Sequence, residues 1–238
     1  MPHHLRPSTP YAEDALLPGD PGRALALAQQ LLTQPRMSNH ARGLWGYTGR
    51  TLEGRPLSIQ STGMGGPSAA IVLRELAELG VRRAIRVGTC GSLVDELAHG
   101  NLTVAGEALA EDGASRALGA GDLAQADGEL TARLVSEHDE SASAARIVST
   151  DLYYGGGSEK GVPPARVDAW RSRGAIAVEM EAATLFTLGP ALGVAAGCVL
   201  AVSDTFAHGR RHRIGDEELA AAAERMGAVA AAAVHVQR

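Results

Sequence analysis

Two glutamates separated by one residue, Glu179 and Glu181, close a short apolar run that begins at Ala175. In an extended chain residues i and i+2 point to the same face, so a strand that reaches Glu181 would place both carboxylates side by side. Burying acids at the end of a strand costs free energy, and a pair of them indicates a bound ligand. The alternative for Glu181 is structural, because the next segment looks helical and an acid in a first helical turn interacts well with free N–H groups.

A third acid, Asp204, follows Ser203 at the end of a strand-like run over residues 195–202. A carboxylate that is partly removed from water can hold or donate a proton near neutral pH, which makes Asp204 the candidate acid. Three arginines follow within residues 210–213, in a polar segment that could swing over a pocket. The alternative is that Asp204 caps the next turn and the arginine segment is a solvated loop.

A possible anion site begins at residues 18–23, Pro-Gly-Asp-Pro-Gly-Arg, a tight turn that opens a helix. Free N–H groups at such a turn can receive an anion, and Arg23 would add charge. Arg86 and the hydroxyl of Thr89 could complete a phosphate site, although no Walker sequence is present. A plain surface turn is the alternative.

The elements that must position these residues alternate between strand-like and helix-like runs. The strand-like runs are residues 57–61, 84–87 and 195–202, and the helix-like runs are residues 68–79, 182–188 and 217–236. Glycine-rich turns follow the first two strands, whereas residues 107–145 have only weak periodicity. The alternation predicts an α/β fold with a mixed, mostly parallel central sheet flanked by helices. Ligands bind such sheets beyond the carboxyl ends of the strands, where the glycines and acids lie.

Composition narrows the class of protein. The 238 residues contain no obvious linker, so we expect one domain over residues 1–238. The first ten residues do not form a signal peptide, and no apolar run reaches the ~20 residues of a membrane span. A net charge of −5 argues against a nucleic-acid partner. We therefore expect a cytoplasmic protein that acts on small molecules.

Cysteine and lysine are scarce. Cys90 and Cys198 both lie in or beside apolar runs, which favours two small buried hydrophobic residues and neither a disulfide framework nor a metal site. Of the 22 basic residues, Lys160 is the only lysine and the other 21 are arginines. Any bound anion is therefore expected to be held by guanidinium groups.

Taken together, the motifs resemble those of the nucleoside phosphorylase family, the group of purine nucleoside and uridine phosphorylases with hexameric members, and are most like the bacterial purine enzymes. The resemblance covers nearly the whole chain. The matching motifs are Pro2-His3 and residues 18–23, 42–49, 61–68, 85–91, 178–183 and 202–204. A series of motifs in the same order is far more specific than any one of them; Gly63-Met64-Gly65 alone, for example, is a near miss to the dinucleotide fingerprint.

The resemblance implies a phosphate site shared by two subunits. Gly19, Arg23, Arg86 and Thr89 would bind phosphate from one subunit, and Arg42 would come from its neighbour. Several guanidinium groups around one phosphate position it for attack. The resemblance also implies a homo-oligomer, with a dimer as the minimum and a hexamer, a trimer of dimers, as the expected assembly.

The nucleoside site is implied in the same way. The ribose would contact Met64, Met180 and Glu181, and the neighbour's His3, or the adjacent His4, would contact the 5′-hydroxyl. The residues implied around the base are Cys90, Gly91, Tyr153, Val178, Glu179 and Ser203, with Tyr153 stacking on it.

The implied reaction is reversible phosphorolysis, in which a purine nucleoside and phosphate give a free base and ribose 1-phosphate. No cofactor and no metal are expected, because inorganic phosphate is a co-substrate. Asp204 would protonate the purine N7, assisted by Arg213 or one of its neighbours. Positive charge would develop on the sugar and negative charge on the base, and the site would stabilise both.

Three alternatives remain at this point. The first alternative is a uridine phosphorylase. Against it, Tyr154–Lys160 lacks the Gln-x-Arg pair that uridine phosphorylases carry. In its favour, residues 61–68 and 181–186 are closer to the uridine enzymes, and Glu217 falls near the place of the purine enzymes' assisting arginine. A nucleosidase would use water in place of phosphate. The third alternative is a non-catalytic protein that binds a nucleoside or an NAD-type ligand.

Overall fold

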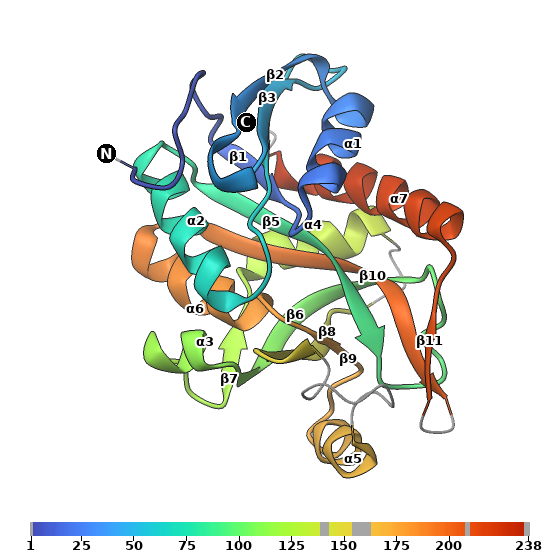
Figure 1. The fold of residues 1–238 in the computed structure, drawn as a ribbon. Coiled ribbons are helices and arrows are strands. Elements are labelled where there is room, and N and C mark those ends of the chain that lie inside the picture. Colours follow the sequence, from blue (N-terminus) through green and yellow to red (C-terminus); the bar gives the residue numbers. More distant parts are fainter. Residues whose placement is uncertain (1, 139–142, 154–162, 208–209, 236–238) are drawn as a thin grey trace.

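The computed structural model describes residues 2–138, 143–153, 163–207 and 210–235. These residues form an eleven-stranded sheet with helices packed against it (Figure 1). The strands are β1 (Asp14–Leu17), β2 (Thr33–Asn39), β3 (Gly46–Arg50), β4 (Pro56–Gln60), β5 (Arg83–Ser92), β6 (Leu102–Glu111), β7 (Leu123–Gln125), β8 (Ala145–Thr150), β9 (Ala177–Glu179), β10 (Ala195–Ala207) and β11 (Arg210–Arg213). The helices are α1 (Pro21–Leu31), α2 (Gly66–Glu78), α3 (Gly113–Ala117), α4 (Gly128–His138), α5 (Pro164–Ser172), α6 (Ala182–Leu192) and α7 (Asp216–Val234), with a 3₁₀ turn at Ala41–Gly43.

The sheet is mixed, with parallel strands at its centre. Its order is β11-β10-β6-β8-β9-β5-β1-β4-β3-β2, and β7 pairs with β6. The pairs β4–β1, β1–β5 and β5–β10 are all parallel, whereas β2, β3 and β4 form an antiparallel meander. Because β10 pairs with both β5 and β6, and β9 pairs with β5, strands β5, β10, β6, β8 and β9 close into a ring. The predicted α/β class with a mixed central sheet is confirmed.

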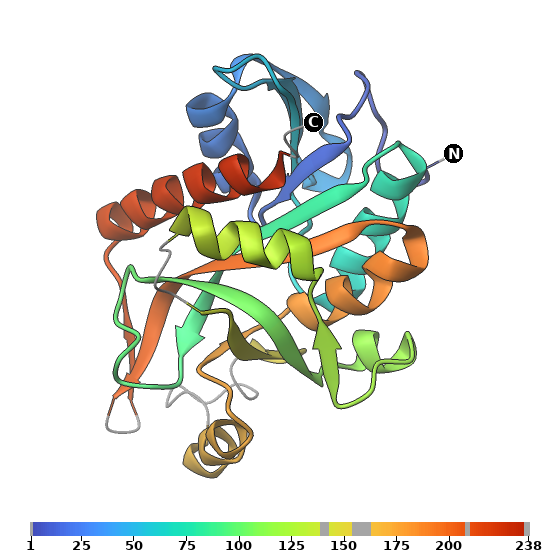
Figure 2. The same cartoon turned by 180° about the vertical axis from the view of Figure 1, so that it is seen from behind.

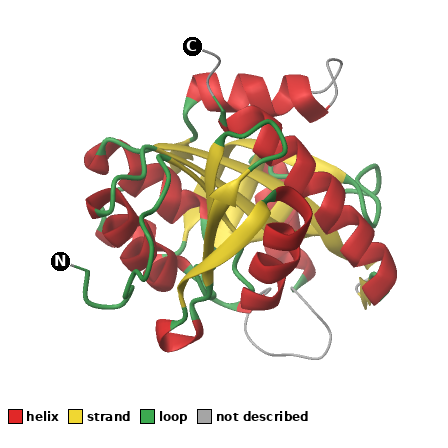
Figure 3. Ribbon diagram, turned by 90° about the horizontal axis from the view of Figure 1, so that it is seen from above, coloured by secondary structure: helices red, strands yellow, loops and turns green. Residues whose placement is uncertain are grey.

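Helices cover both faces of the central strands. Alternate residues of β1 point to opposite faces, as strand geometry requires: Leu16 packs with α1, α4 and α7, and Leu17 packs with α2 and α6. Figure 1 shows α2 and α6 lying together on one side, and the view from behind shows α4 beside α7 on the other (Figure 2). The view from above shows the strands between these helical layers (Figure 3).

Two strands are longer than the sequence indicates. The predicted strand over residues 84–87 was expected to end in a glycine turn, but β5 continues through Ser92. It stays extended because β10 and β9 both offer backbone partners beyond Gly88. Likewise β10 passes the predicted end at Val202, with a register shift before Asp204.

The arginine segment is a strand and neither a swinging segment nor a solvated loop, which corrects the sequence-based expectation. β11 pairs antiparallel with the end of β10, and Arg213 lies opposite Asp204. A hairpin of this kind fixes the arginine side chains relative to the acid.

The predicted helices agree well with the structure, and the weakly periodic region does not lack structure. α2 begins two residues before Ser68 and stops before Gly80, whose φ of +101° favours glycine. Residues 107–145 contain the end of β6, α3, β7 and α4, short elements whose many alanines and glycines hide any period. Among the described residues, no helix is both long and apolar enough to cross a membrane.

Candidate active site

A cavity of about 570 Å³ collects most of the predicted site residues. Its walls come from the start of α1, the β4–α2 turn, β5, the β9–α6 junction, β11 and α7. The predicted residues that line it are Gly19, Arg23, Met64, Arg86, Thr89, Tyr153, Glu179, Met180, Glu181 and Arg213. Asp20, Pro21, Gly63, Gly88 and Leu219 complete the lining. Segments far apart in the sequence therefore meet at one place, as the motifs predicted.

Arg86 lies at the back of this cavity, between the two glutamates. Its Nε donates to Glu179 Oε2 at 2.8 Å, and a terminal nitrogen forms an ion pair with Glu181 Oε2. Burial acts to lower the pKa of Arg86, but the carboxylates of Glu181 and Glu179 outweigh it and raise that pKa above its ordinary value. The guanidinium lies over Gly88, where a Cβ would be 2.7 Å from Arg86 Cζ. Arg86 is therefore a fixed, permanently charged group.

The two glutamates have different surroundings, and they do not share a strand. β9 ends at Glu179, and Glu181 is the N-cap residue of α6. Glu179 takes the capping bonds, because it accepts the N–H groups of Glu181 at 2.8 Å and Ala182 at 3.0 Å, and the hydroxyl of Ser149. The structural alternative proposed for Glu181 therefore belongs to Glu179.

Glu181 reaches across the cavity to the start of α2. Its Oε1 accepts the Gly65 N–H at 2.5 Å, and Gly65 is the N-cap of that helix. Burial raises the pKa of Glu181; Arg86 opposes the rise and the nearby Glu179 carboxylate adds to it. Held by one N–H and one guanidinium, this carboxylate keeps lone pairs for further donors such as ligand hydroxyls.

Arg23 supplies a second positive charge at the cavity. The predicted helix start is confirmed, since α1 begins at Pro21 and Asp20 caps it by accepting the Arg23 N–H at 2.7 Å. Burial lowers the pKa of the Arg23 guanidinium; Asp20 acts against this, and the cations of Arg86 and Arg213 add to the lowering. Guanidinium groups that repel one another across a cavity are stabilised by an anion between them.

Five other predicted residues form the buried wall beside the cavity and do not line it. They are Cys90, Gly91, Val178, Ser203 and Asp204. Strand register brings them together, because Gly91 of β5 pairs with Val178 of β9 on one side and with Asp204 of β10 on the other. Phe206 covers Gly91, where a Cβ would lie 2.8 Å from its ring. Burial raises the pKa of the Cys90 thiol, which packs as an apolar group.

Asp204 is held at both carboxylate oxygens and is 1% exposed. The hydroxyl of Ser203 donates to Oδ2 at 2.7 Å, and Arg211 Nε donates to Oδ1 at 2.5 Å. The Arg211 guanidinium also stacks on the ring of Tyr153, 4.6 Å from its centroid, and donates to the Tyr153 hydroxyl. Arg211 is thus the arginine paired with the candidate acid. The sequence left this role open between Arg213 and its neighbours, and Arg213 lines the cavity.

His3 and Arg42 lie elsewhere, in a second cavity of about 370 Å³. Arg6, His4, His40 and Ala41 complete its lining, so the cavity is rich in basic side chains. Arg42 has φ 58° and ψ 19°, a left-handed conformation that is uncommon for a residue other than glycine and is often found at functional positions. The structure therefore brings these two predicted residues together, but away from the first cavity.

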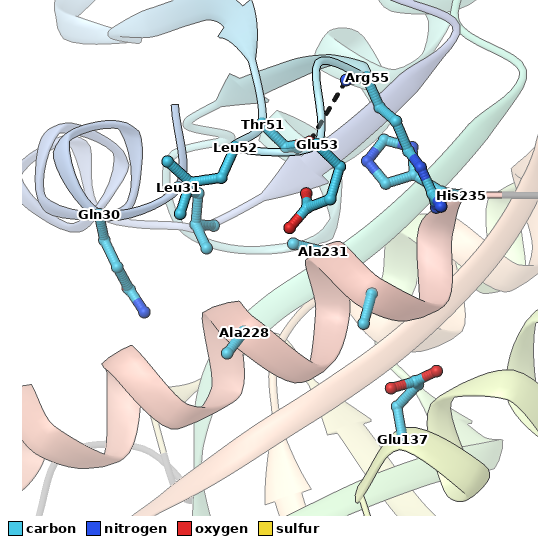
Figure 4. Close-up of a pocket in the computed structure, with 11 residues that line it drawn as sticks. Gln30, Leu31, Thr51, Leu52, Glu53, Arg55, Glu137, Ala228, Ala231 and His235 are labelled. Atoms are coloured by element: carbon cyan, nitrogen blue, oxygen red, sulfur yellow. Dashed lines mark hydrogen bonds between the residues drawn. The ribbon is translucent and has the colours of Figure 1, made fainter. Parts of the chain in front are cut away.

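A third cavity, of about 380 Å³, lies between the end of α1, the β3–β4 turn, the end of α4 and α7 (Figure 4). Its buried His235 places Nδ1 2.9 Å from Asp14 Oδ2. Gln30 and Leu31 line it at the opposite end of α1 from the first cavity, about 16 Å away along an 11-residue helix. It contains none of the predicted site residues. In the described part of the chain no group of three or more His, Cys, Asp or Glu residues could hold a metal ion.

The sequence matches a family model described as the phosphorylase superfamily over residues 13–235. The chain belongs to the phosphorylase superfamily. A purine nucleoside phosphorylase of the DeoD type from Clostridium beijerinckii is 36% identical over 213 residues, 87% of each chain. A DeoD-type enzyme from Clostridium novyi is 37% identical over 207 residues, 83% of this chain and 84% of its own. A guanosine phosphorylase from Halorubrum lacusprofundi is 33% identical over 220 residues, 89% of this chain and 86% of its own. The predicted family is confirmed.

Sequence reasoning missed residues that support the first cavity and the N-terminal segment. Ser149 binds Glu179 from a neighbouring strand, and only the β8–β9 register reveals it. Glu75, which binds the N-terminal segment, could have been found from the sequence. It is an acid three residues after Val72 on the apolar face of a helix, where a charge needs a partner. The predicted absence of a Gln-x-Arg pair concerns residues 154–160, which lie outside the described residues.

Proposed function

We propose that this chain is a purine nucleoside phosphorylase that converts a purine nucleoside and phosphate reversibly into a free purine and ribose 1-phosphate. The names of its relatives, purine nucleoside phosphorylase and guanosine phosphorylase, support this assignment. The observation that carries it is the buried Asp204, held by Ser203 and Arg211 beside a cavity that three arginines line. Such a site offers an acid for a leaving base and cations for a phosphate nucleophile.

Phosphate binds at the end of the cavity formed by Gly19, Arg23, Arg86 and Thr89. The N-terminus of α1 and two guanidinium groups face this end, and both favour an anion. Phosphate held there needs no activation by a base. Its role is to attack the sugar carbon as the glycosidic bond breaks, so positioning is the main contribution of these residues.

The ribose lies over Met64 and Met180 with its 2′- and 3′-hydroxyls donating to Glu181. Positive charge grows on the sugar as the bond to the base lengthens, and the phosphate and the Glu181 carboxylate stabilise that charge. Glu179 does not bind the nucleoside in this account. Its carboxylate already accepts three donors besides Arg86, so it orients Arg86 and fixes the start of α6.

The base binds against the wall of Gly91 and Val178, with Tyr153 over it. Asp204 accepts from both Ser203 and Arg211 in the structure, so it first takes up a proton from solvent. It then donates this proton to the purine N7, and the base leaves as a neutral molecule. Arg211 then stabilises the carboxylate that remains. Ser203 orients the acid by its bond to Oδ2. No cofactor takes part, because the proton and the phosphate supply all the chemistry that the step needs.

The active assembly is a homo-oligomer with shared sites, a hexamer built as a trimer of dimers. Among the described residues that line the first cavity, the charges of Arg23, Arg86 and Arg213 are balanced by Asp20, Glu179 and Glu181. A phosphate dianion in such a neutral cavity needs a further cation, which Arg42 of a neighbouring subunit supplies, while His3 of that subunit reaches the 5′-hydroxyl. Two buried thiols without a disulfide fit a cytoplasmic location.

Mixing inactive subunits tests the sharing. Arg42→Ala removes what a subunit donates, and Glu181→Gln removes what it uses in its own site. Subunits of the two variants, unfolded together and refolded, should regain activity because a site with Glu181 from one chain receives Arg42 from the other. A mixture that stays as inactive as each variant alone contradicts shared sites.

A substrate panel tests the reaction. Inosine, guanosine, adenosine, methylthioadenosine and uridine are incubated with and without phosphate, and the free base is measured by chromatography. We expect purine release that depends on phosphate. Uridine cleavage without purine cleavage would favour the uridine phosphorylase, purine release without phosphate would favour the nucleosidase, and binding without turnover would favour the non-catalytic protein.

A further inference from the structure

Glu75 is a buried acid that the proposed chemistry does not use. It lies on the face of α2 that packs into the core and is 6% exposed. Its carboxylate receives the backbone N–H groups of three consecutive residues: His3 and His4 donate to Oε1 at 2.9 Å each, and Leu5 donates to Oε2 at 2.7 Å. Three successive N–H groups around one anion make a concave anion-binding nest. Here the anion belongs to the protein itself, so the N-terminal segment is wrapped around Glu75.

The Glu75 carboxylate binds the ring of His4 but not the ring of His3, so the two histidines differ in their surroundings. Nδ1 of His4 lies 2.7 Å from Glu75 Oε1. Burial acts to raise the pKa of Glu75, but the N–H groups of Leu5, His4 and His3 and the His4 ring together lower it to about 2. An ionised carboxylate only accepts, so Nδ1 of His4 carries the hydrogen and points inward. His3 is exposed, and its ring forms no hydrogen bond or ion pair with another described residue.

The segment is also held by packing. Leu5 is 1% exposed and belongs to the core formed with α2 and α6. Its two anchors, the Leu5 side chain and the Glu75 nest, hold the segment where His3 and Arg42 line the same basic cavity. The backbone that carries the donated His3 ring is therefore fixed.

Helix α2 links this anchor to the chain's own active site. Its N-cap, Gly65, donates to Glu181, and Glu75 lies ten residues later, about 15 Å along the helix. One rigid element therefore carries both the N–H that holds the sugar-binding acid and the anchor of the segment donated to a neighbour.

We propose that Glu75 is a positioning residue that fixes the N-terminal segment so that His3, and not His4, meets the 5′-hydroxyl of the nucleoside in the neighbouring subunit's site. The inference rests on the proposed function, because it needs a shared nucleoside site. Glu75 itself touches no substrate. It acts by removing the freedom that the His3 ring would otherwise lose on binding.

The test compares two nucleosides that differ only at the 5′ position. Glu75→Gln keeps the size of the side chain but replaces one acceptor oxygen by an amide that donates, so the nest cannot hold all three N–H groups. In the intact enzyme, E75Q should lower kcat/KM for inosine by about 10- to 100-fold, the range expected when a positioned group is misplaced by ~1 Å. For 5′-deoxyinosine the change should stay within about threefold, because there is no hydroxyl for His3 to meet.

Further variants keep the result decisive. His3→Ala should reproduce the dependence on the 5′-hydroxyl, and E75Q should add little in the His3→Ala background, since the two residues act as one unit. Glu129→Gln, an exposed acid on α4, is the matched control and should behave as wild type. If E75Q does not fold, Glu75→Asp, which keeps the charge on a shorter side chain, replaces it with the same pair of nucleosides.

An equal loss on both nucleosides, no loss on either, or a 5′-hydroxyl effect that follows His4→Ala and not His3→Ala would overturn the inference. These results differ from failure of the proposed function. A wild-type enzyme that cleaves no purine nucleoside would overturn the proposed function, and the inference with it.

Discussion

Asp204→Asn separates acid catalysis from every other contribution of the site. Asparagine has nearly the same shape as aspartate, and its amide oxygen can still accept from Arg211, but it has no proton to give. Asp204 is 1% exposed and the Arg211 side chain is 27% exposed, so after the substitution Arg211 stays partly hydrated and stacked on Tyr153. Because the aspartate is buried and accepts two hydrogen bonds, the substitution should cost about 1–3 kcal/mol in stability.

The effect on the rate should be larger, and it is measured separately from stability. A positioned general acid contributes roughly 10²- to 10⁴-fold, which is about 3 to 5 kcal/mol of activation free energy. Phosphorolysis of inosine by Asp204→Asn should slow by that factor. A nucleoside methylated at N7, such as 7-methylguanosine, already carries the positive charge that the proton would supply, so its phosphorolysis should change by less than about tenfold. Both rates are measured by absorbance under saturating phosphate.

The comparison of inosine with 7-methylguanosine tests whether Asp204 is the acid. Asp168→Asn, an exposed aspartate on α5, serves as the control and should leave both rates unchanged. An equal loss of activity on inosine and 7-methylguanosine, or an inosine rate within threefold of wild type, would refute the assignment of Asp204 as the acid.

Three more predictions follow from individual contacts. Arg211→Gln should lower kcat for inosine by about 10²-fold, as expected for loss of one charge-stabilising donor, whereas Arg213→Gln should mainly raise the KM for phosphate; steady-state kinetics that reverse this ranking would contradict the Asp204–Arg211 pairing. Gly88→Ala places a Cβ 2.7 Å from the Arg86 guanidinium carbon, so we expect a phosphate KM at least tenfold higher and about 1–3 kcal/mol of destabilisation, and an unchanged KM in a phosphate titration would show that Arg86 does not need this space. Because the pKa of Glu75 falls from 4.5 unfolded to about 2 folded, its ionised form stabilises the fold by about 3 kcal/mol above pH 4.5, and this contribution is lost as the pH falls toward 2. Urea unfolding of wild type and Glu75→Gln should thus differ most at pH 7 and less at pH 3.5, and a difference that is constant with pH would contradict the nest.

The sequence predicted the elements whose ends are set by local residue preferences. The turn before Arg23 opens a helix because Pro and Asp have strong preferences at a helix start, and Gly80 ends α2 because only glycine adopts its backbone angle freely. Most of the motif residues also meet at or beside one cavity, since the ends of parallel strands gather at one edge of a sheet. Local chemistry and periodicity were sufficient for these predictions.

Residues whose partners come from another part of the sheet could not be predicted. Nothing local indicates that β5 continues past Gly88, because the continuation depends on pairing with β10 and β9. The choice between Arg211 and Arg213 depends on the β10–β11 hairpin, which places Arg213 opposite Asp204 but leaves Arg211 to form the ion pair. The division of labour between Glu179 and Glu181 likewise follows from where β9 stops, a boundary that the apolar run does not mark.

The central claim is that phosphate, and not water, attacks the sugar of a purine nucleoside. Phosphorus NMR of inosine and phosphate mixed with the wild-type enzyme tests this directly, with hypoxanthine measured in the same sample. The account predicts that a ribose 1-phosphate signal grows in equal amount to the hypoxanthine while the inorganic phosphate signal declines. Hypoxanthine release with an unchanged phosphate signal would contradict it.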